Sequence, residues 1–223
     1  LLPLTGGSHI NLMRAESPGP QVEKLVPKVQ STAKILYGIY ILLTILEILL
    51  LLAGKMPLFD AVTTTFGTAG TGGFGIKNNS IAGYSTYLQN VVTVFMILFG
   101  VNFNFYFLLL LRRFRKAFSM EEVRAYLLII AAAILIITLN IRDMYESPLH
   151  AFQQAAFQVG SIITTTGFST TDFDLWPEAS KTILVLLMFI GACAGRTGGG
   201  IKVSRFTILF KSQFLFFAIV ALT

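Results

Sequence analysis

Cysteine, histidine and charged side chains are all scarce in this sequence. Its 223 residues include one cysteine, two histidines and only 13% charged residues. The single Cys193 excludes a disulfide framework and a zinc ribbon, since both need several thiols. His9 and His150 have no second histidine or acid at the spacing of metal ligands. We therefore interpret them as residues at the boundaries of apolar segments.

Motifs of common enzymes and nucleotide-binding domains are also missing. The sequence contains no H-E-x-x-H and no G-x-S-x-G pattern, and its glycine-rich stretch lacks the G-x-x-x-x-G-K-[ST] spacing of a phosphate-binding loop. Residues 1–30 lack the basic start, apolar core and cleavage site of a signal peptide, so we expect none there. We expect a protein that is not an enzyme and carries no covalently bound cofactor.

Long apolar runs are the dominant feature that is present. Apolar residues make up 54% of the chain, and the mean hydropathy is +0.73. A helix needs about 20 apolar residues to cross the hydrocarbon core of a bilayer. Four such runs occur, at residues 32–52, 87–111, 123–141 and 180–210, the last one interrupted near its middle. The sequence predicts an all-α, multi-pass membrane protein, with an unassigned apolar tail at residues 213–223.

The net charge of +6 raises the question of a nucleic-acid partner, and the positions of the charges decide it. Most of the basic residues lie outside the two long connections, residues 54–86 and 142–179, which carry an acidic excess. Basic connections face the cytoplasm in membrane proteins. This topology accounts for the charge, and we expect no nucleic-acid partner. The acidic excess could attract cations or simply form a solvated rim.

An internal repeat links the two halves of the sequence. Residues 58–75 align without a gap on residues 152–169, an offset of 94. Each copy consists of an apolar span, a short apolar helix behind a proline, a Thr/Gly segment and a second span. We predict the two short helices at residues 58–69 and 151–163.

The short helices are too short to cross a bilayer, so they must return to the side from which they entered. Irregular backbone at that depth is tolerated only where it is buried or lines a water-filled path. The segments 71–75 and 165–169 that follow the helices resemble the Thr-Val-Gly-Tyr-Gly filter of potassium channels, in which rings of carbonyl oxygens replace the water around the ion. The alternative is two unrelated surface turns, which Gly and Thr also favour.

Five glycines between residues 191 and 200 interrupt the fourth apolar run. Each glycine costs about 1 kcal/mol relative to alanine inside a helix, so we expect the chain to unwind at mid-membrane. Such a break indicates a neighbouring cavity, whereas the alternative is a close helix crossing through small residues. Glu47 is a second unusual feature, because an acid within a span is either functional or hydrogen-bonded between packed helices.

The sequence resembles the TrkH/KtrB family of potassium transporters, and the resemblance covers nearly all of residues 1–212. Residues 12–20 resemble the end of the family's first repeat, residues 71–75 and 164–171 its second and third filters, and residues 191–202 the glycine-rich break of its third repeat. The resemblance implies residues 1–31 as the end of repeat 1, 32–116 as repeat 2 and 117–212 as repeat 3. It leaves most of repeat 1 and all of repeat 4 unrepresented.

The resemblance implies potassium uptake across the cytoplasmic membrane of a prokaryote, with a homodimer and a TrkA/KtrA-like cytoplasmic ring of nucleotide-binding subunits as partners. The residues expected to bind potassium are Thr71, Gly72, Gly73, Phe74, Thr165, Thr166, Gly167 and Phe168. The residues expected to form a gating loop below the filter are Gly191, Gly195, Arg196, Thr197, Gly198, Gly199, Gly200 and Lys202.

Three questions stay open from the sequence. Gly73 and Gly167 match the potassium-selective form of the family, but a sodium-permeable or sodium-coupled transporter is an alternative because two filter segments are not represented. A non-conducting scaffold that binds a cytoplasmic regulator is another. Arg196 stands where the family usually has a small hydroxyl residue, so it either repels cations in the pore, holds the loop closed through a carbonyl, or is an engineered change.

Overall fold

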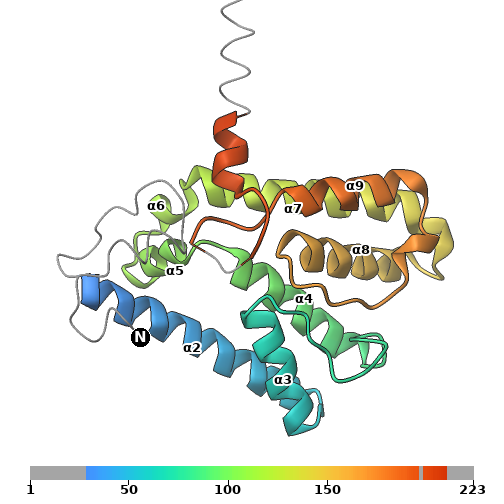
Figure 1. Cartoon of the computed structure of the whole chain (residues 1–223), viewed down its shortest axis with the longest axis horizontal. Helices are drawn as coiled ribbons and strands as arrows, with labels where there is room; N and C mark the ends of the chain where they lie inside the picture. The colour runs from blue at the N-terminus through green and yellow to red at the C-terminus, as the bar shows by residue number, and fades with distance from the viewer. Residues whose placement is uncertain (1–28, 196–197, 210–223) are drawn as a thin grey trace, which may run out of the picture.

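The computed structural model describes residues 29–195 and 198–209. Within these ranges the secondary structure is helical, apart from one isolated bridge between Ile190 and Ile201, and no β-strand occurs. Figure 1 shows the helices arranged in two groups that follow one another along the chain. The expected end of repeat 1, up to residue 28, and the apolar tail lie outside the described residues.

The first group contains α2 (Val29–Ala53), α3 (Leu58–Ala69) and α4 (Thr86–Gly100). Leucine and isoleucine fill α2, which suits a helix in contact with lipid. Pro57 directly precedes α3. Proline restricts the backbone to angles that suit the start of a helix, so α3 begins after it. With 12 residues, α3 is about 18 Å long and cannot cross a bilayer, as the sequence predicted.

The second group contains α7 (Glu121–Ile141), α8 (Pro148–Ile163) and α9 (Glu178–Phe189), with short 3-10 turns η2 (Arg142–Met144) and η3 (Phe173–Leu175) on either side of α8. The short helix α8 again begins with a proline, and the Ser147 hydroxyl accepts a hydrogen bond from the His150 N–H (3.2 Å). It starts three residues before the predicted residue 151.

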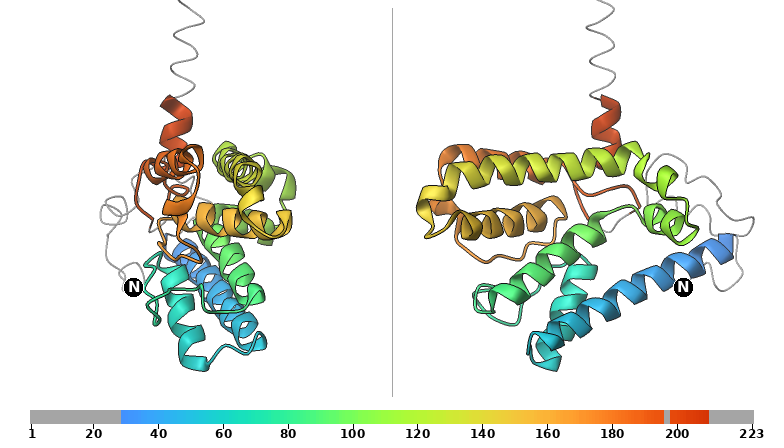
Figure 2. Two further views of the ribbon diagram at one scale, coloured as in Figure 1. Left: turned by 90° about the vertical axis from the view of Figure 1, so that its right-hand side faces the viewer. Right: turned by 180° about the vertical axis from the view of Figure 1, so that it is seen from behind.

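The two groups share one packing scheme. In the first, α2, α3 and α4 all contact one another, and in the second, α7, α8 and α9 do the same. The groups meet where α4 packs against α8, and the views in Figure 2 show α8 between α4 and the α7–α9 pair. The same order of long helix, short helix and second helix in both groups is what the predicted repeat requires.

The second apolar run differs from the prediction of one continuous span over residues 87–111. It consists of α4 and α5 (Phe103–Leu110), which meet at an angle of 90°. The helix ends at Gly100, and Asn102 then caps a new helix by accepting a hydrogen bond from the Asn104 N–H (3.0 Å). A glycine followed by an Asn N-cap thus outweighs the continuous hydropathy. A short helix α6 (Phe114–Phe118) follows.

Two helices are long and apolar enough to cross a membrane, at Lys34–Ala53 and Glu121–Met144, and the bent pair makes up to three within the described residues. The fourth expected span, residues 180–210, is divided. Its first part is α9, residues 203–209 are helical again, and the residues between them lie in an irregular loop with the bridge at its ends. The break predicted from the glycines is therefore present.

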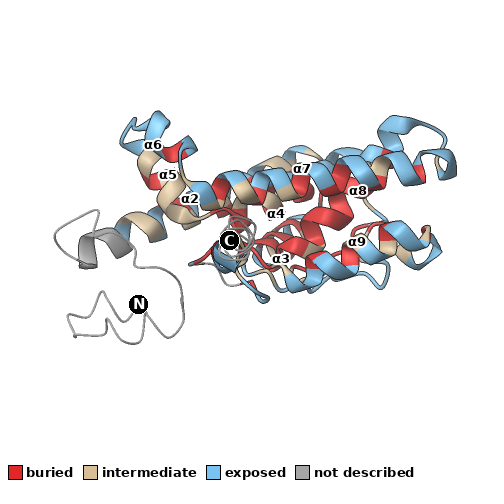
Figure 3. Ribbon diagram, turned by 90° about the horizontal axis from the view of Figure 1, so that it is seen from above, coloured by how far each residue is buried: buried red, intermediate tan, exposed pale blue. Residues whose placement is uncertain are grey.

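Buried side chains form two main clusters, one based in each group. Figure 3 shows the buried residues in red where the helices face one another. The first group's cluster includes Leu51, Met56 and Val92, and it also takes Phe157 and Phe168 from the second group. Many large apolar side chains on the outer faces of α2, α7 and α9 are exposed, as expected for helices that contact lipid or further helices. Phe168 comes from the second predicted filter segment, so this segment is anchored in the shared core.

Candidate functional site

The two predicted filter segments leave their short helices with the same hydrogen bonds. The Gly72 N–H donates to the Gly67 carbonyl (2.8 Å), and the Thr166 N–H donates to the Ser161 carbonyl (2.9 Å). Further equivalent bonds are Gly70 N to Phe66 O and Thr164 N to Gly160 O, and Thr71 N to Thr68 O and Thr165 N to Ile162 O. Every pair is separated by 94 residues, the offset found in the sequence.

The backbone of both segments also takes the left-handed conformation at equivalent places. The φ angles are 52° at Thr71, 64° at Gly73, 58° at Thr165 and 88° at Gly167. Positive φ is uncommon for a threonine, and such strain is concentrated at functional sites. A left-handed residue between ordinary ones turns the peptide plane, so successive carbonyl oxygens can face one side.

Five carbonyl groups in these segments are unpaired. Within the described residues, no hydrogen bond reaches the carbonyl oxygens of Gly72, Gly73, Thr165, Thr166 or Gly167. Thr166 is itself buried, so water does not replace the missing donor freely. Buried backbone carbonyls nearly always have a partner. Carbonyl oxygens that no N–H group occupies are what a site for a dehydrated cation requires.

The two segments lie directly against one another. A Cβ atom added to Gly73 would stand only 1.9 Å from the Thr166 carbonyl oxygen, so only glycine fits at this contact. The end of the second segment is also tied to the connection that follows the first, because the Ile81 N–H donates to the Ser169 carbonyl (3.1 Å). The Ser169 N–H donates to the Ser80 hydroxyl (3.2 Å). The structure therefore brings both predicted filter segments to one place.

The two filter phenylalanines have opposite environments. Phe168 is 1% exposed in the cluster of the first group, and its ring tip would lie 2.9 Å from a Cβ at Gly67. Phe74, at the equivalent position in the first group, is 80% exposed. The buried ring of Phe168 supports its segment from behind. Any part that these two residues have in binding potassium, as the sequence predicted, therefore belongs to their main chain.

Side chains of α8 hold the second segment from behind. The Ser161 hydroxyl donates to the Phe168 carbonyl (2.5 Å), and the hydroxyls of Thr164 and Thr166 lie 2.7 Å apart. The Thr170 hydroxyl donates to the Gln154 side chain (2.5 Å). Residues 161–170 are thus fixed by a buried polar network, which sets the position of the unpaired carbonyls.

The glycine-rich loop lies against the N-terminal end of this segment. The Gly199 N–H donates to the Thr165 hydroxyl (2.9 Å). A Cβ at Gly198 would be 2.9 Å from the Thr164 carbonyl oxygen, so the loop backbone packs directly on the filter. The Lys202 ammonium donates to the Gly198 carbonyl. Arg196 and Thr197, which the sequence placed in this loop, lie outside the described residues.

The loop also closes on itself at its base. The Gly191 N–H donates to the Ile201 carbonyl (2.9 Å), and the Ile201 N–H donates to the Phe189 carbonyl (2.9 Å). A Cβ at Gly191 would lie 2.0 Å from the Gly199 carbonyl oxygen. Gly195 and Gly200 have positive φ angles of 80° and 74°. The glycines therefore make a compact loop of crossing backbones, not a helix crossing.

Comparison with known proteins gives a family for this fold and site. A family model described as a cation transport protein, TrkH, matches residues 1–218. The chain belongs to the TrkH family. The resemblance predicted from the filter segments and the glycine-rich break is thereby confirmed, and so are the all-α membrane fold and the expectation of a non-enzyme.

Named relatives and a solved structure agree with this family. The potassium uptake protein TrkH of Salmonella typhimurium is 38% identical over 216 residues, which are 95% of this chain and 45% of that protein. TrkG of Escherichia coli is 34% identical over 221 residues, 96% of this chain and 45% of that protein. The crystal structure of the potassium transporter TrkH from Vibrio parahaemolyticus superposes with a TM-score of 0.79 at 33% identity, covering 93% of this chain and 46% of that one. The chain spans less than half the length of these relatives.

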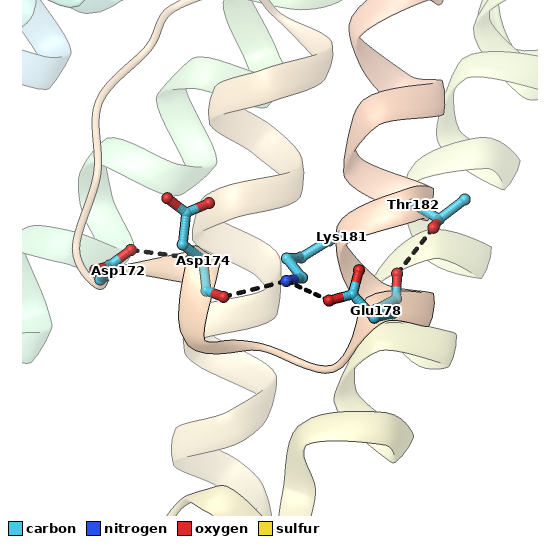
Figure 4. A network of polar contacts seen from close by, with 5 residues as sticks. All are labelled: Asp172, Asp174, Glu178, Lys181 and Thr182. Atoms are coloured by element: carbon cyan, nitrogen blue, oxygen red, sulfur yellow. Dashed lines mark hydrogen bonds and ion pairs between the residues drawn. The ribbon is translucent and has the colours of Figure 1, made fainter.

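A cavity with two acidic residues, the acidic vestibule, lies beside the C-terminal end of the second filter segment. This cavity of ≈ 370 Å³ is lined by Asn79, Ala82, Ser169, Thr170, Thr171, Asp172, Phe173 and Asp174. Figure 4 shows the Asp174 carboxylate pointing away from Lys181, which donates to the Asp174 carbonyl (3.3 Å) and pairs with Glu178 (2.7 Å). The ion pair of Lys181 is thus with Glu178, and the Asp172 carboxylate accepts a hydrogen bond from the Asp174 N–H (3.0 Å).

A tyrosine fixes the connection that follows the first filter segment. The Tyr84 hydroxyl donates to the Asp60 carboxylate of α3 (2.7 Å). Burial, together with this hydrogen bond and the negative charge of Asp60, raises the pKa of Tyr84 to about 12. The hydroxyl therefore stays a neutral donor at physiological pH, and Lys77 lies 3.9 Å above the centre of the Tyr84 ring.

Glu47 is fully buried between α2 and α3, with 0% exposure. Thr68 of α3 lies near it, but the Thr68 hydroxyl donates to the Thr64 carbonyl (2.9 Å). Among the described residues neither carboxylate oxygen of Glu47 has a hydrogen-bond partner, which does not fit the expectation of a hydrogen-bonded acid.

No group of three potential metal ligands occurs in the part of the chain that the structure describes, and His150 contacts Gln154 and Tyr145.

The sequence analysis missed two side chains at the base of the loop, Glu122, which contacts the loop, and Asn102, which contacts Glu122. Glu122 accepts a hydrogen bond from the Ala194 N–H (2.6 Å) and another from the Asn102 side chain (2.9 Å). An acid in the first turn of a helix usually interacts with the helix dipole, so nothing in the sequence distinguished Glu122. Asn102 was hidden in an apolar run, although its capping preference was a usable signal.

Proposed function

We propose that this chain forms part of a pore for potassium uptake across the cytoplasmic membrane. The observation that carries the proposal is the pair of filter segments with matching left-handed residues, unpaired carbonyls and direct mutual contact. The relatives named as potassium uptake proteins support the choice of ion. Carbonyl oxygens that replace the hydration shell allow a cation to leave water at little cost.

Particular atoms have particular tasks in this proposal. The carbonyl oxygens of Gly72, Gly73, Thr165, Thr166 and Gly167 coordinate the dehydrated ion. The Thr71 carbonyl takes the place equivalent to that of Thr165. Asp172 and Asp174 raise the local concentration of cations at the outer entrance, and their effect decreases as salt screens it.

The two filter segments supply part of a ring, and further units complete it. Phe168 shows how a filter phenylalanine is buried by the neighbouring unit, because it lies in the cluster of the first group. Phe74 is exposed at the equivalent position, so another unit of the same kind fits on that side. A four-unit pore, assembled as a homodimer and controlled by a cytoplasmic nucleotide-binding ring, is what the family resemblance implies.

The glycine-rich loop acts as the gate in this proposal. It reaches the inner end of the filter through the bond from Gly199 to Thr165, where an ion leaving the filter would pass. The crossing backbones at Gly191 and Gly199 make it compact, and Lys202 fixes the Gly198 carbonyl. Displacing the loop would open the path to the cytoplasmic side.

Reconstitution of the full-length protein into liposomes tests this function. We expect uptake of radioactive rubidium that potassium inhibits and that sodium inhibits only weakly. Equal inhibition by sodium would favour the sodium-permeable alternative. Binding of a cytoplasmic regulator without any cation flux would favour the scaffold alternative and contradict the proposal.

Arg196 provides a separate test of the gate. A guanidinium in the loop would repel cations or fix a carbonyl, and both effects would reduce flux. We expect Arg196→Ser to raise rubidium uptake in the full-length protein. Arg205→Ser, a change of the same kind in the helix that follows the loop, serves as the control. Equal uptake by the parent protein and Arg196→Ser would show that Arg196 does not obstruct the pore.

A further inference from the structure

One carboxylate joins the two places where helices break. The bend between α4 and α5 and the start of the glycine-rich loop both lie against Glu122 of α7. Asn102 at the bend donates through its Nδ2 to Glu122 Oε2 (2.9 Å), and the Ala194 N–H donates to Glu122 Oε1 (2.6 Å). The Cys193 N–H donates to the Gly100 carbonyl (3.2 Å), which joins the two breaks directly.

The surroundings favour strong hydrogen bonds at this carboxylate. Cys193 and Val123 are fully or almost fully buried, Ala194 is nearly so, and Glu122 itself is half-buried. Hydrogen bonds to an ionised carboxylate are shorter and roughly twice as strong as those between neutral groups. Tyr126, one turn further along α7, donates to the Ile97 carbonyl (3.2 Å), so α7 is held against α4 at this level.

The orientation of the Asn102 amide is fixed by two contacts. Its Oδ1 accepts the hydrogen bond from the Asn104 N–H that caps α5, so its nitrogen must be the atom that faces Glu122. One side chain thus sets the start of α5 and binds the carboxylate. The loop is held by Glu122 near Ala194 and by the Thr165 hydroxyl at Gly199.

We propose that Glu122 is a positioning residue that couples the bend at α5 to the gating loop. The connection after α5 carries Arg112, Arg113, Arg115 and Lys116, which the positive-inside rule places on the cytoplasmic side. A movement of α5 there shifts Asn102, weakens its bond to Glu122 and releases the loop at Ala194. The coupling rests on the proposed function of the loop as a gate, whereas the hydrogen bonds at Glu122 do not.

An exchange of the acid and the amide group between positions 122 and 102 tests the coupling. In Glu122→Gln the new amide nitrogen faces the Asn102 nitrogen, so two donors oppose each other. In Asn102→Asp two carboxylates oppose each other. In the double variant, the introduced glutamine can accept from the Ala194 N–H and donate to the introduced aspartate, which still caps α5. We expect each single variant to disturb the loop and the double variant to restore it.

The reactivity of Cys193 reports on the loop without any need for transport. It is fully buried, and any further cysteine of the full-length protein is replaced for this measurement. We expect each single variant to raise the rate of Cys193 alkylation by N-ethylmaleimide by about tenfold, as the loss of a charged hydrogen bond implies. The double variant should return to within about twofold of the parent. Glu146→Gln, which removes an exposed carboxylate elsewhere, should leave the rate unchanged.

Rubidium uptake then separates the two proposals. We expect the single variants to raise uptake under non-activating conditions with an unchanged half-saturating rubidium concentration, because the filter is intact. Unchanged alkylation in both single variants, or a double variant worse than either, would overturn the role of Glu122. If Glu122→Gln does not assemble, Asn102→Asp and the double variant decide the question. The expected alkylation pattern in a parent protein that transports no rubidium would instead contradict the proposed function.

Discussion

Replacing Gly73 with alanine is expected to reduce rubidium uptake by at least about tenfold in the full-length protein. The new Cβ atom would stand 1.9 Å from the Thr166 carbonyl oxygen, and the residue has a φ of 64° that L side chains rarely adopt. Both segments must then separate, and the carbonyl oxygens lose their common geometry. Initial rates of rubidium uptake in proteoliposomes measure the effect.

Two other glycines act as controls for this substitution. Gly167→Ala meets the same restriction on φ, but nothing lies within 4 Å of its Cβ, so we expect a smaller loss of uptake. Gly38→Ala in α2 has open space and ordinary helical angles, so uptake should be unchanged. Uptake by Gly73→Ala at the level of Gly38→Ala would show that close contact between the segments is not needed.

Replacing Phe168 with alanine is expected to destabilise the protein by about 3–5 kcal/mol, the range for a fully buried aromatic side chain. The ring fills the cluster of the first group and packs on Gly67, so its loss leaves a cavity between the two units. Ser161 would still bind the carbonyl at position 168, but the anchor of the segment is gone. Thermal unfolding in detergent, followed by tryptophan fluorescence or by loss of soluble protein, measures the change.

The equivalent residue extends this test to the further units of the proposed ring. If another unit covers Phe74 in the full-length protein, Phe74→Ala should destabilise that protein nearly as much as Phe168→Ala does. Phe114→Ala, on an exposed part of α6, should have an effect below about 0.5 kcal/mol. A small effect for Phe74→Ala would mean that Phe74 faces lipid or water and that the units do not form a closed ring.

The repeated helices could be predicted from the sequence because they depend on local signals. Proline marks the start of α3 and α8, and the Thr/Gly segments mark their ends. The bend between α4 and α5 was missed because the sequence is apolar on both sides of residues 100–102. Hydropathy reports burial in lipid and not helix continuity, so the glycine and the capping asparagine were the relevant signals.

The filter segments and the loop could be located from the sequence, but their contacts could not. Nothing in the order of residues shows that Gly73 meets Thr166 or that Gly199 meets Thr165, since these contacts join segments far apart in the chain. The contacts of Glu122 could not be predicted from the sequence for the same reason. Its partners Asn102 and Ala194 are distant in the chain, and only folding brings them together.

The most direct test of the account is the location of bound ions in the full-length protein. We predict that crystals grown with thallium or rubidium show anomalous density beside the carbonyl oxygens of Thr165, Thr166 and Gly167 and of Gly72 and Gly73. These peaks should disappear when the ion is replaced by sodium. Peaks only in the acidic vestibule, or none between the two filter segments, would contradict the central claim that these carbonyls replace the ion's water.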